Sequence, residues 1–263
     1  PNLGSESRSV EDRRPERLSV MFGPSFRPLS TTPSWRMSSM HDHRPEASPD
    51  HPDLRDYVGW HAAYDDPGSS LSVRLRHVQR AILEWLDRTS GPARVLSVCA
   101  GQGHDILGAL EERSRTDRAR VTGALIEVDP TNVAIARGRI AHLDLALTVV
   151  EADAGTTDTY TGLVPADLLL LSGIMGNISA PDIERLVRVS RQFCAAGATV
   201  IWTRGAQDPD LGPDIRRWFD HAGFEELSCE EWIEGTGMRV GVNRLITPPQ
   251  PLHPGEEIFT FYR

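Results

Sequence analysis

The stretch Val95-Leu-Ser-Val-Cys-Ala-Gly-Gln-Gly-His-Asp-Ile106 places an apolar run directly before two glycines that one residue separates. In an open α/β sheet, an apolar strand that ends in a glycine turn and leads into a helix borders the crevice where a nucleotide binds. Gly101 and Gly103 allow a tight turn and close approach to a ligand, because neither carries a Cβ. The stretch therefore predicts a nucleotide-binding strand, turn and helix.

The helix after the glycine turn departs from the dinucleotide-binding pattern. That pattern requires a third glycine where this chain has Ile106, so that the helix can pack closely on a pyrophosphate. NAD is therefore disfavoured as the ligand. A nucleoside ligand without phosphates tolerates the change.

Acidic residues follow the next two apolar runs. Glu127 stands 24 residues after Gly103, about the spacing at which a carboxylate accepts hydrogen bonds from ribose hydroxyls. Asp129 is the competing choice, or it caps the helix that begins at Pro130. Asp153, after the third run, is placed to accept a hydrogen bond from an adenine amino group, although acidic residues are common in such loops. These acids extend the predicted nucleoside site over three strand ends.

Beyond Arg94, short apolar runs alternate with amphipathic stretches, which is typical of a parallel sheet buried on both faces. Expected strands are 95–99, 121–128, 147–150, 167–171 and 199–203, with helices near 104–114, 131–142, 181–193 and 212–222. After Gly223 the pattern predicts only strands, at 224–232, 238–245 and 258–262. We therefore expect a Rossmann-like α/β three-layer sandwich whose mostly parallel sheet has an antiparallel C-terminal edge.

The N-terminal third of the chain divides into two parts. Residues 1–53 are rich in Ser, Pro and Arg, so we interpret them as a disordered or non-native extension. Residues 54–90 predict two helices, broken near residues 65–68, with Ser69 or Ser70 as the second N-cap. They form an N-terminal helical appendage, and residues 91–263 form the ligand-binding domain.

The composition narrows the function. With 263 residues and 39% hydrophobic content, the chain can form one substantial core. Its formal net charge of −9 lacks the positive field of a typical nucleic-acid binder, which favours a small or neutral substrate. All 28 basic residues are arginines, which excludes Schiff bases, pyridoxal phosphate attachment and a phosphate-loop lysine.

Cysteine usage and hydropathy indicate the setting. The three cysteines, Cys99, Cys194 and Cys229, are odd in number and widely spaced, which favours a reducing cytoplasm. The sequence has no run of about 18 apolar residues, so we expect a soluble protein without a membrane partner. No close Cys or His pair exists beyond His41 and His43, so we expect no metal site.

Taken together, the motifs resemble class I S-adenosylmethionine (SAM)-dependent methyltransferases of the small-molecule type, over roughly residues 94–246. The resemblance rests on the glycine turn, Glu127-Val-Asp-Pro-Thr-Asn-Val-Ala-Ile-Ala-Arg137, Glu151-Ala-Asp-Ala154, the loop Leu171–Ser179, and Phe193–Trp202. It implies SAM as cofactor and a seven-stranded sheet that ends in an antiparallel hairpin. The residues from 248 to 263 have no counterpart in this resemblance.

The resemblance also assigns roles within a SAM site. Gly101 and Gly103 approach the amino-acid portion of SAM, and Asp153 with Ala154 approaches the adenine. Because N-terminal helices cover the site in related enzymes, the resemblance makes residues 54–90 a helical lid and Arg74 a candidate partner for the SAM carboxylate. The candidate cofactor ligands are Tyr64, Arg74, Ala100, Gly101, Gln102, Gly103, Glu127, Asp129, Asp153, Ala154 and Ser172.

Candidate acceptor and catalytic residues come from the lid and from the loop after the fourth strand. That loop lacks an Asn-Pro-Pro-Tyr motif, so a small organic acceptor is expected rather than adenine, cytosine or glutamine amide nitrogen. The candidate substrate residues are Tyr57, Trp60, Met175 and Asn177. His61 and His104 are the histidines near the predicted crevice and are candidate general bases. The alternatives are core packing for the aromatic and histidine side chains, and a turn-forming role for Asn177.

We therefore expect a methyltransferase that acts on an oxygen or nitrogen atom of a small organic acceptor, mainly by proximity. One alternative is an RNA or protein methyltransferase, which calls for a local basic patch. The dense basic cluster lies before the second strand, remote from the crevice, and consists of Arg113, Arg115, Arg118 and Arg120. A second alternative is a SAM-binding sensor or scaffold without activity.

Overall fold

The computed structural model describes residues 61–205, 207–233 and 236–262. The predicted extension 1–53 and the first part of the predicted lid therefore lie outside the described residues. The elements in chain order are η1 (His61–Asp65), α2 (Ser70–Arg88), β1 (Ala93–Val98), α3 (His104–Glu111), α4 (Arg115–Ala119), β2 (Val121–Glu127), α5 (Pro130–His142), β3 (Ala146–Glu151), η2 (Thr157–Tyr160), β4 (Ala166–Leu171), α6 (Ala180–Phe193), β5 (Cys194–Gly205), α7 (Gly212–His221), β6 (Phe224–Ile233) and β7 (Met238–Leu245).

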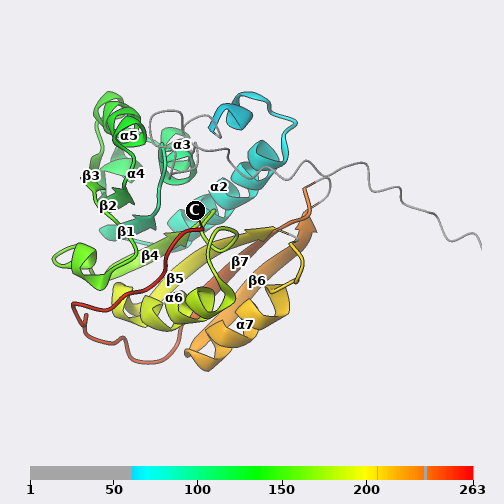
Figure 1. Cartoon of the computed structure of the whole chain (residues 1–263). Coiled ribbons are helices and arrows are strands. Elements are labelled where there is room, and N and C mark those ends of the chain that lie inside the picture. The colour runs from blue at the N-terminus through cyan, green and yellow to red at the C-terminus, as the bar shows by residue number, and fades with distance from the viewer. Residues whose placement is uncertain (1–60, 206, 234–235, 263) are drawn as a thin grey trace, which may run out of the picture. The chain divides into compact units, whose positions relative to one another are not determined.

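The strands form one seven-stranded sheet with the order β3-β2-β1-β4-β5-β7-β6 (Figure 1). Strands β1 to β5 run parallel to one another, whereas β7 is antiparallel to both β5 and β6. The predicted parallel sheet with an antiparallel C-terminal edge is confirmed. Strands β1 and β4 are central neighbours, and the helices that follow them, α3 and α6, pack in different cores on opposite faces of the sheet. In open α/β sheets, ligands bind at the carboxyl ends of such a pair of strands.

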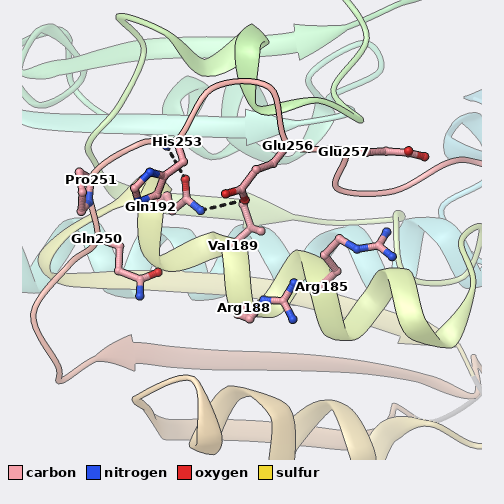
Figure 2. A pocket seen from close by; sticks show the side chains of 9 residues that line it. All are labelled: Arg185, Arg188, Val189, Gln192, Gln250, Pro251, His253, Glu256 and Glu257. Atoms are coloured by element: carbon pink, nitrogen blue, oxygen red, sulfur yellow. Dashed lines mark hydrogen bonds between the residues drawn. The ribbon is translucent and has the colours of Figure 1, made fainter.

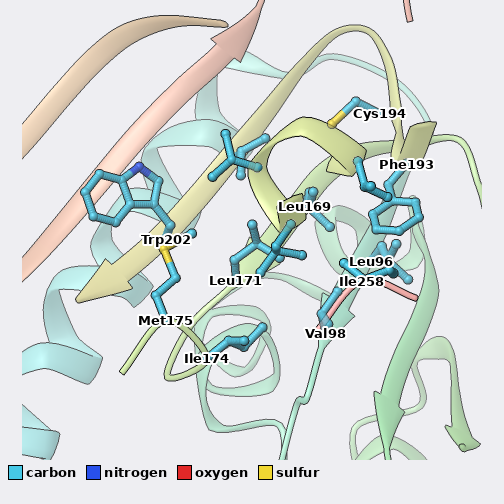
Figure 3. Close-up of a cluster of buried hydrophobic side chains, with 14 of the residues drawn as sticks. Leu96, Val98, Leu169, Leu171, Ile174, Met175, Phe193, Cys194, Trp202 and Ile258 are labelled. Atoms are coloured by element: carbon cyan, nitrogen blue, oxygen red, sulfur yellow. The ribbon is translucent and has the colours of Figure 1, made fainter. Parts of the chain in front are cut away.

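The central strands are apolar throughout because each face of the sheet carries a separate core. In β1, Leu96 and Val98 pack with α6 and α7, whereas Val95 packs with α2, α3 and α5. Figure 3 shows the first of these cores, with Leu96 and Val98 drawn near Leu169 and Leu171 of β4. Helices on both faces leave no solvated face of the central strands, so the predicted three-layer sandwich is confirmed.

Helix α2 packs on the same face of the sheet as α3 and α5 along most of its length. Ser69 caps it by accepting a hydrogen bond from the Ser72 backbone N–H, at 3.1 Å, which agrees with the predicted start. Its buried side chains Val78, Ile82 and Leu86 belong to the same core as α3 and α5. The prediction placed all of residues 54–90 in a lid. In the described part of that range, Tyr64 of η1 and Gln79 of α2 contact the predicted site residue His104, and Arg74 of α2 contacts Tyr64.

The helices between β1 and β2 are shorter than predicted. Helix α3 ends at Glu111 rather than near residue 114, and the separate turn α4 follows it, capped by the Ser114 hydroxyl. Arg115 and Asp117 within α4 are exposed, so no apolar periodicity marked this helix in the sequence. Among the described helices, none is both long and apolar enough to cross a membrane.

The predicted strand at residues 258–262 is wrong. Residues 256–262, the C-terminal segment, form no strand of the sheet, and one isolated bridge joins Glu257 to Thr156. The apolar alternation that suggested a strand has another cause. Ile258 and Phe259 are buried, at 0% and 3% exposure, in the core beneath α6, and Figure 3 shows Ile258 near Leu96. The segment therefore covers the end of this core as an irregular strap.

Gln192 of α6 fixes the start of the C-terminal segment. Its side-chain oxygen accepts the His253 backbone N–H at 2.8 Å, and its amide nitrogen donates to the Glu256 carboxylate at 3.2 Å (Figure 2). A pocket of about 640 Å³ lies between α6 and residues 250–257. It lies beside α6 rather than at the glycine turn, so it does not correspond to the predicted nucleoside site.

Candidate functional site

The glycine turn after β1 has a left-handed backbone at three of its positions. The φ angles are +50° at Cys99, +53° at Gly101 and +72° at Gly103. A Cβ at Gly103 would lie 2.7 Å from a Leu107 side-chain carbon and 2.9 Å from a Leu125 side-chain carbon. Both the conformation and the packing therefore require glycine at this last position.

Cys99 is the non-glycine residue of this turn with a positive φ. A left-handed conformation costs an L-residue roughly 1–2 kcal/mol, and such strain is concentrated at functional sites. Burial raises the pKa of the Cys99 thiol well above its usual value, and the charges of Glu127 and Asp153 raise it further. The thiol therefore stays protonated and is not a nucleophile at neutral pH.

Glu127, at the end of β2, is joined directly to the glycine turn. One carboxylate oxygen accepts the Gly101 backbone N–H at 2.7 Å, and the other accepts those of Val128 and Asp129 at 3.0 and 2.9 Å. Burial raises the pKa of the Glu127 carboxyl, while these hydrogen bonds oppose the increase. A carboxylate offers about four lone-pair directions, so one direction remains for a ligand hydroxyl.

The predicted adenine loop lies directly beside Glu127. The Ala152 backbone N–H donates to the Glu127 backbone carbonyl at 3.0 Å, and the Asp153 carboxylate accepts the Gly155 N–H at 2.8 Å. Ala154 is buried, and its carbonyl accepts the hydroxyl hydrogen of Tyr160 at 2.8 Å. The structure therefore brings together the glycine turn, Glu127 and Asp153, as predicted from their positions at three strand ends.

Asp129 has the alternative role that the sequence left open. It is the N-cap of α5, and its side chain accepts the backbone N–H groups of Thr131 and Asn132 at 2.8 and 2.9 Å. The buried side chain of Asn132 in turn accepts a hydrogen bond from the Gln102 amide at 3.2 Å. The cap of α5 and the glycine turn are thus parts of one hydrogen-bonded unit.

Arg74 of α2 lies among η1, the start of α3 and the loop after β4. It is buried, and its guanidinium donates to the Tyr64 hydroxyl. Burial raises the pKa of Tyr64 to about 12, against the opposing charge of Arg74. Burial likewise raises the pKa of Asp105, and the charge of Arg74 again opposes the increase. Gly173 lies close by, since a Cβ there would be 3.6 Å from Arg74 Nη1.

Asp105 is a site residue that the sequence analysis missed. It stands in the first turn of α3, directly after the glycine turn. A carboxylate there is favoured by the positive end of the helix dipole. The sequence could have pointed to Asp105 only by its position in that first turn. Nothing in the sequence shows that Arg74 lies beside it in the fold.

His104 lies in a network at the start of α3. Its ring centroid is 4.6 Å from that of Tyr64, and its nitrogens lie 3.2 Å from the Gln102 side-chain oxygen and 3.4 Å from Arg139 Nη1. Burial, and then the charge of Arg139, lowers the pKa of His104 to about 4. The imidazole is therefore neutral at pH 7. Of the other candidates in the lid, Tyr57 and Trp60 lie outside the described residues, and the backbone of His61 begins η1.

The lowered pKa of His104 predicts that the folded state gains stability as the pH rises from about 4 to 6.5. The unfolded chain, in which the histidine pKa is about 6.5, binds more protons in this window than the folded chain does. The gain is about 3 kcal/mol at most. Urea denaturation across this window should show a smaller rise for His104→Gln than for the wild type. An equal rise in both proteins would contradict the prediction.

The loop after β4 holds the predicted acceptor residues. The side chain of Met175 is fully buried, and its backbone carbonyl accepts a hydrogen bond from Arg204 of β5. The Asn177 amide donates to the Gly173 carbonyl at 2.8 Å, which is the turn-forming contact that the sequence left open. Ser172 follows the last residue of β4 and is partly buried. The loop thus contributes backbone and turn contacts in this structure, and Arg204 is a neighbour that the sequence analysis did not identify.

The basic cluster before β2 lies at the opposite ends of the strands from the glycine turn. Arg113 pairs with Asp87 and Arg115 with Asp144, each at 2.6 Å. Arg120 donates to the backbone carbonyls of residues 86 and 91. These contacts agree with a solvated face that supports the ends of α2 and α5.

Metal chemistry receives no support from the described part of the chain. Within residues 61–205, 207–233 and 236–262, no group of three or more His, Cys, Asp or Glu side chains could hold a metal ion. The three cysteines are free thiols.

Comparisons with known proteins identify the fold. No protein-family model and no curated protein matches the sequence. Among solved structures, a possible exported protein from Bordetella parapertussis is 21% identical, with a TM-score of 0.51 and 68% of each chain covered. Magnesium protoporphyrin IX methyltransferase from Synechocystis PCC 6803, with bound SAM, is 12% identical, with a TM-score of 0.56 and coverage of 74% of this chain and 93% of that chain.

The same Synechocystis enzyme with bound S-adenosylhomocysteine is 11% identical and also has a TM-score of 0.56, with coverage of 72% of this chain and 94% of that chain. At these identities the likeness concerns the fold. The strand order and the antiparallel hairpin β6–β7 agree with it. The chain therefore has the Rossmann-like fold of class I SAM-dependent methyltransferases.

Proposed function

We propose that this chain is a SAM-dependent methyltransferase that transfers a methyl group to an oxygen or nitrogen atom of a small organic acceptor. The observation that carries the proposal is the hydrogen bond from Gly101 N–H to the Glu127 carboxylate, at 2.7 Å. It joins a left-handed glycine turn to a buried acid at the carboxyl ends of two neighbouring parallel strands. That location is where open α/β sheets bind nucleotide-like ligands.

The chemistry of the donors and acceptors fits SAM. Glu127 retains one acceptor direction for a ribose hydroxyl, and Asp153 offers a second carboxylate for an exocyclic amino group. The guanidinium of Arg74, on the far side of the crevice, can pair with a carboxylate. Ile106, in place of a third glycine, suits a ligand that has no pyrophosphate. The proposed cofactor site therefore has a matching group for a ribose hydroxyl, the adenine amino group and the carboxylate of SAM.

When bound, SAM supplies an electrophilic methyl group on a sulfonium. The acceptor's lone pair forms the new bond to carbon while the electrons of the carbon–sulfur bond pass to sulfur, which gives S-adenosylhomocysteine. An N–H or O–H proton leaves to a base. Holding the reacting atoms in line can contribute on the order of 7–11 kcal/mol. His61 and His104 remain the proposed bases, but a pKa of about 4 makes His104 a weak one, so positioning carries most of the acceleration.

The acceptor is proposed to enter between the N-terminal helices and residues 172–179. This route brings it to the loop after β4, opposite Arg74 and Tyr64. The absence of an Asn-Pro-Pro-Tyr motif from that loop and the net charge of −9 support a small acceptor rather than a nucleic acid. The free cysteines support a cytoplasmic setting.

Calorimetry with SAM and with S-adenosylhomocysteine tests the cofactor site, and a turnover assay tests the activity. The wild-type protein should bind both compounds. It should also release S-adenosylhomocysteine when SAM is incubated with a metabolite extract, but not with buffer alone. Binding without turnover in any extract would leave a sensor or scaffold as the function. Failure to bind either compound would refute the proposed function.

Replacing Glu127 by alanine should weaken SAM binding by about 10- to 100-fold, because the variant loses a charged hydrogen-bond acceptor and the anchor of the glycine turn. Glu151→Ala is the matched control. Glu151 is the register partner of Glu127 on β3, but it is exposed. Calorimetry should show near-wild-type affinity for the control. If the two folded variants bind SAM with equal affinity, Glu127 is not part of the SAM site.

A further inference from the structure

Two buried arginines lie side by side at the edge of the proposed acceptor site. Arg204 of β5 and Arg239 of β7 are direct register partners, so their side chains leave the same face of the sheet. They are only 6% and 2% exposed. Two like charges in such positions repel each other, and burial makes each more costly. The arrangement therefore requires compensating negative charge.

Arg239 has this compensation. Asp210 accepts hydrogen bonds from both terminal nitrogens of its guanidinium, the second at 2.8 Å. The pairing lowers the pKa of Asp210 to about 2. The Gly212 backbone N–H, at the start of α7, also donates to this carboxylate at 3.0 Å. Asp210 is thus fully committed to Arg239 and to the loop that precedes α7.

Arg204 lacks an equivalent partner. Its Nη1 donates to the Met175 backbone carbonyl, while its buried Nε has no hydrogen-bond partner in the described part of the chain. Asp210 acts on Arg204 through its charge alone, whereas it hydrogen-bonds Arg239. A neutral carbonyl does not balance a buried guanidinium. The Nε edge is the side of the group that a carboxylate can engage with two parallel hydrogen bonds.

Arg204 lies beside the loop after β4, where the acceptor is proposed to bind. It stands at the carboxyl end of β5 and contacts the loop that also contains Asn177. The next loop along the sheet closes onto the same place, because the Gln207 side chain donates to the Gly176 carbonyl at 3.2 Å. Tyr262, which lies near Arg204, is 48% exposed, so its ring can move aside for a ligand.

We propose that Arg204 binds a carboxylate group of the acceptor, through Nε and Nη2, and so selects acceptors that carry one. This inference rests on the proposed function for the identity of the ligand as an acceptor. The bidentate geometry favours a planar carboxylate. A bound acceptor carboxylate gives Arg204 a hydrogen-bonded negative partner, as Asp210 does for Arg239.

If Arg204 has a purely structural role, as an anchor of the Met175 carbonyl, Arg204→Met should lower the melting temperature. The proposal predicts otherwise. If the charge is uncompensated, Arg204→Met should melt at or above the wild-type temperature, because the variant removes a buried cost. Arg239→Met should melt lower, since it leaves Asp210 unpaired. A melting temperature of Arg204→Met that falls as far as that of Arg239→Met would overturn the proposal.

The binding test uses benzoate as the probe and benzamide as its neutral counterpart, with the full chain at constant ionic strength. In the presence of S-adenosylhomocysteine, benzoate should raise the melting temperature of the wild type more than benzamide does. Arg204→Met should lose this difference. Arg216→Met is the matched control and should keep it, because Arg216 is a surface residue paired with Glu226 and Glu231.

The outcomes separate the two levels of the proposal. If S-adenosylhomocysteine raises the melting temperature but benzoate and benzamide act alike, the carboxylate site is wrong and the proposed function stands. If S-adenosylhomocysteine has no effect but the benzoate difference depends on Arg204, the carboxylate site stands and the proposed function fails. A benzoate effect retained in Arg204→Met overturns the site.

Discussion

Replacing Gly101 by arginine should abolish measurable SAM binding, with an affinity loss of more than about 100-fold. Gly101 is buried, has a φ of +53°, and donates its N–H to Glu127. An arginine side chain there must extend into the crevice where the methionine portion of SAM is proposed to lie. It also strains the backbone by about 1–2 kcal/mol. Calorimetry with SAM and with S-adenosylhomocysteine measures the loss.

Gly91→Arg is the control that separates occlusion of the crevice from backbone strain and added charge. Gly91 also has a positive φ, +85°, but a Cβ there meets no atom within 4 Å. It precedes β1 at the opposite end of the strand. This variant should therefore lose comparable stability and retain SAM affinity. If both folded variants bind SAM like the wild type, the glycine turn is not the cofactor site.

The sequence predicted the glycine turn and the position of Glu127 well, because both depend on local features. An apolar run before spaced glycines defines a strand and a turn without reference to the rest of the chain. Parallel strands then bring the ends of consecutive runs to one edge of the sheet, and Glu127 and Asp153 lie together there. The sheet topology thus brings three separate motifs together at one edge.

The C-terminal segment could not be predicted in the same way. Ile258 and Phe259 follow a polar stretch and resemble a short closing strand. The backbone partners of this segment belong instead to loops far away in the sequence, such as Gly155, whose carbonyl accepts the Ile258 N–H at 2.7 Å. Alternating apolar residues indicate that their side chains are buried. They do not indicate whether the backbone there forms a strand or a loop.

Polar residues near the proposed site show a second limit of prediction from sequence. Asp129 caps α5 and Asn177 closes a turn, and each residue type is equally suited to these local roles and to ligand binding. Arg204 shows the reverse case. Nothing in the sequence distinguishes it from the other arginines, and its missing counter-charge follows only from the neighbours that the fold gives it.

Ile258→Ala should reduce the free energy of unfolding by about 2–5 kcal/mol and should also weaken SAM binding about tenfold. Ile258 is fully buried. Its backbone N–H donates to Gly155, and the Tyr262 N–H donates to Asn177 at 2.9 Å. The segment therefore ties the proposed adenine loop to the loop after β4. A cavity at Ile258 lets the adenine loop relax, so that Asp153 is less well positioned.

Ile215→Ala distinguishes this coupling from a general loss of stability. Ile215 of α7 is equally buried, belongs to the same core, and carries the same side chain. Urea denaturation should show similar losses for both variants, whereas calorimetry should show weaker SAM binding for Ile258→Ala alone. Ile258→Val, with an expected cost of about 0.5–1.5 kcal/mol, extends the test if the alanine variant does not fold. Equal SAM affinity in the position-258 and position-215 variants would show that the segment stabilises the core without positioning the cofactor loop. A difference would mean that the chain's last residues, which have no counterpart in the resemblance to known methyltransferases, complete the cofactor site from outside the sheet.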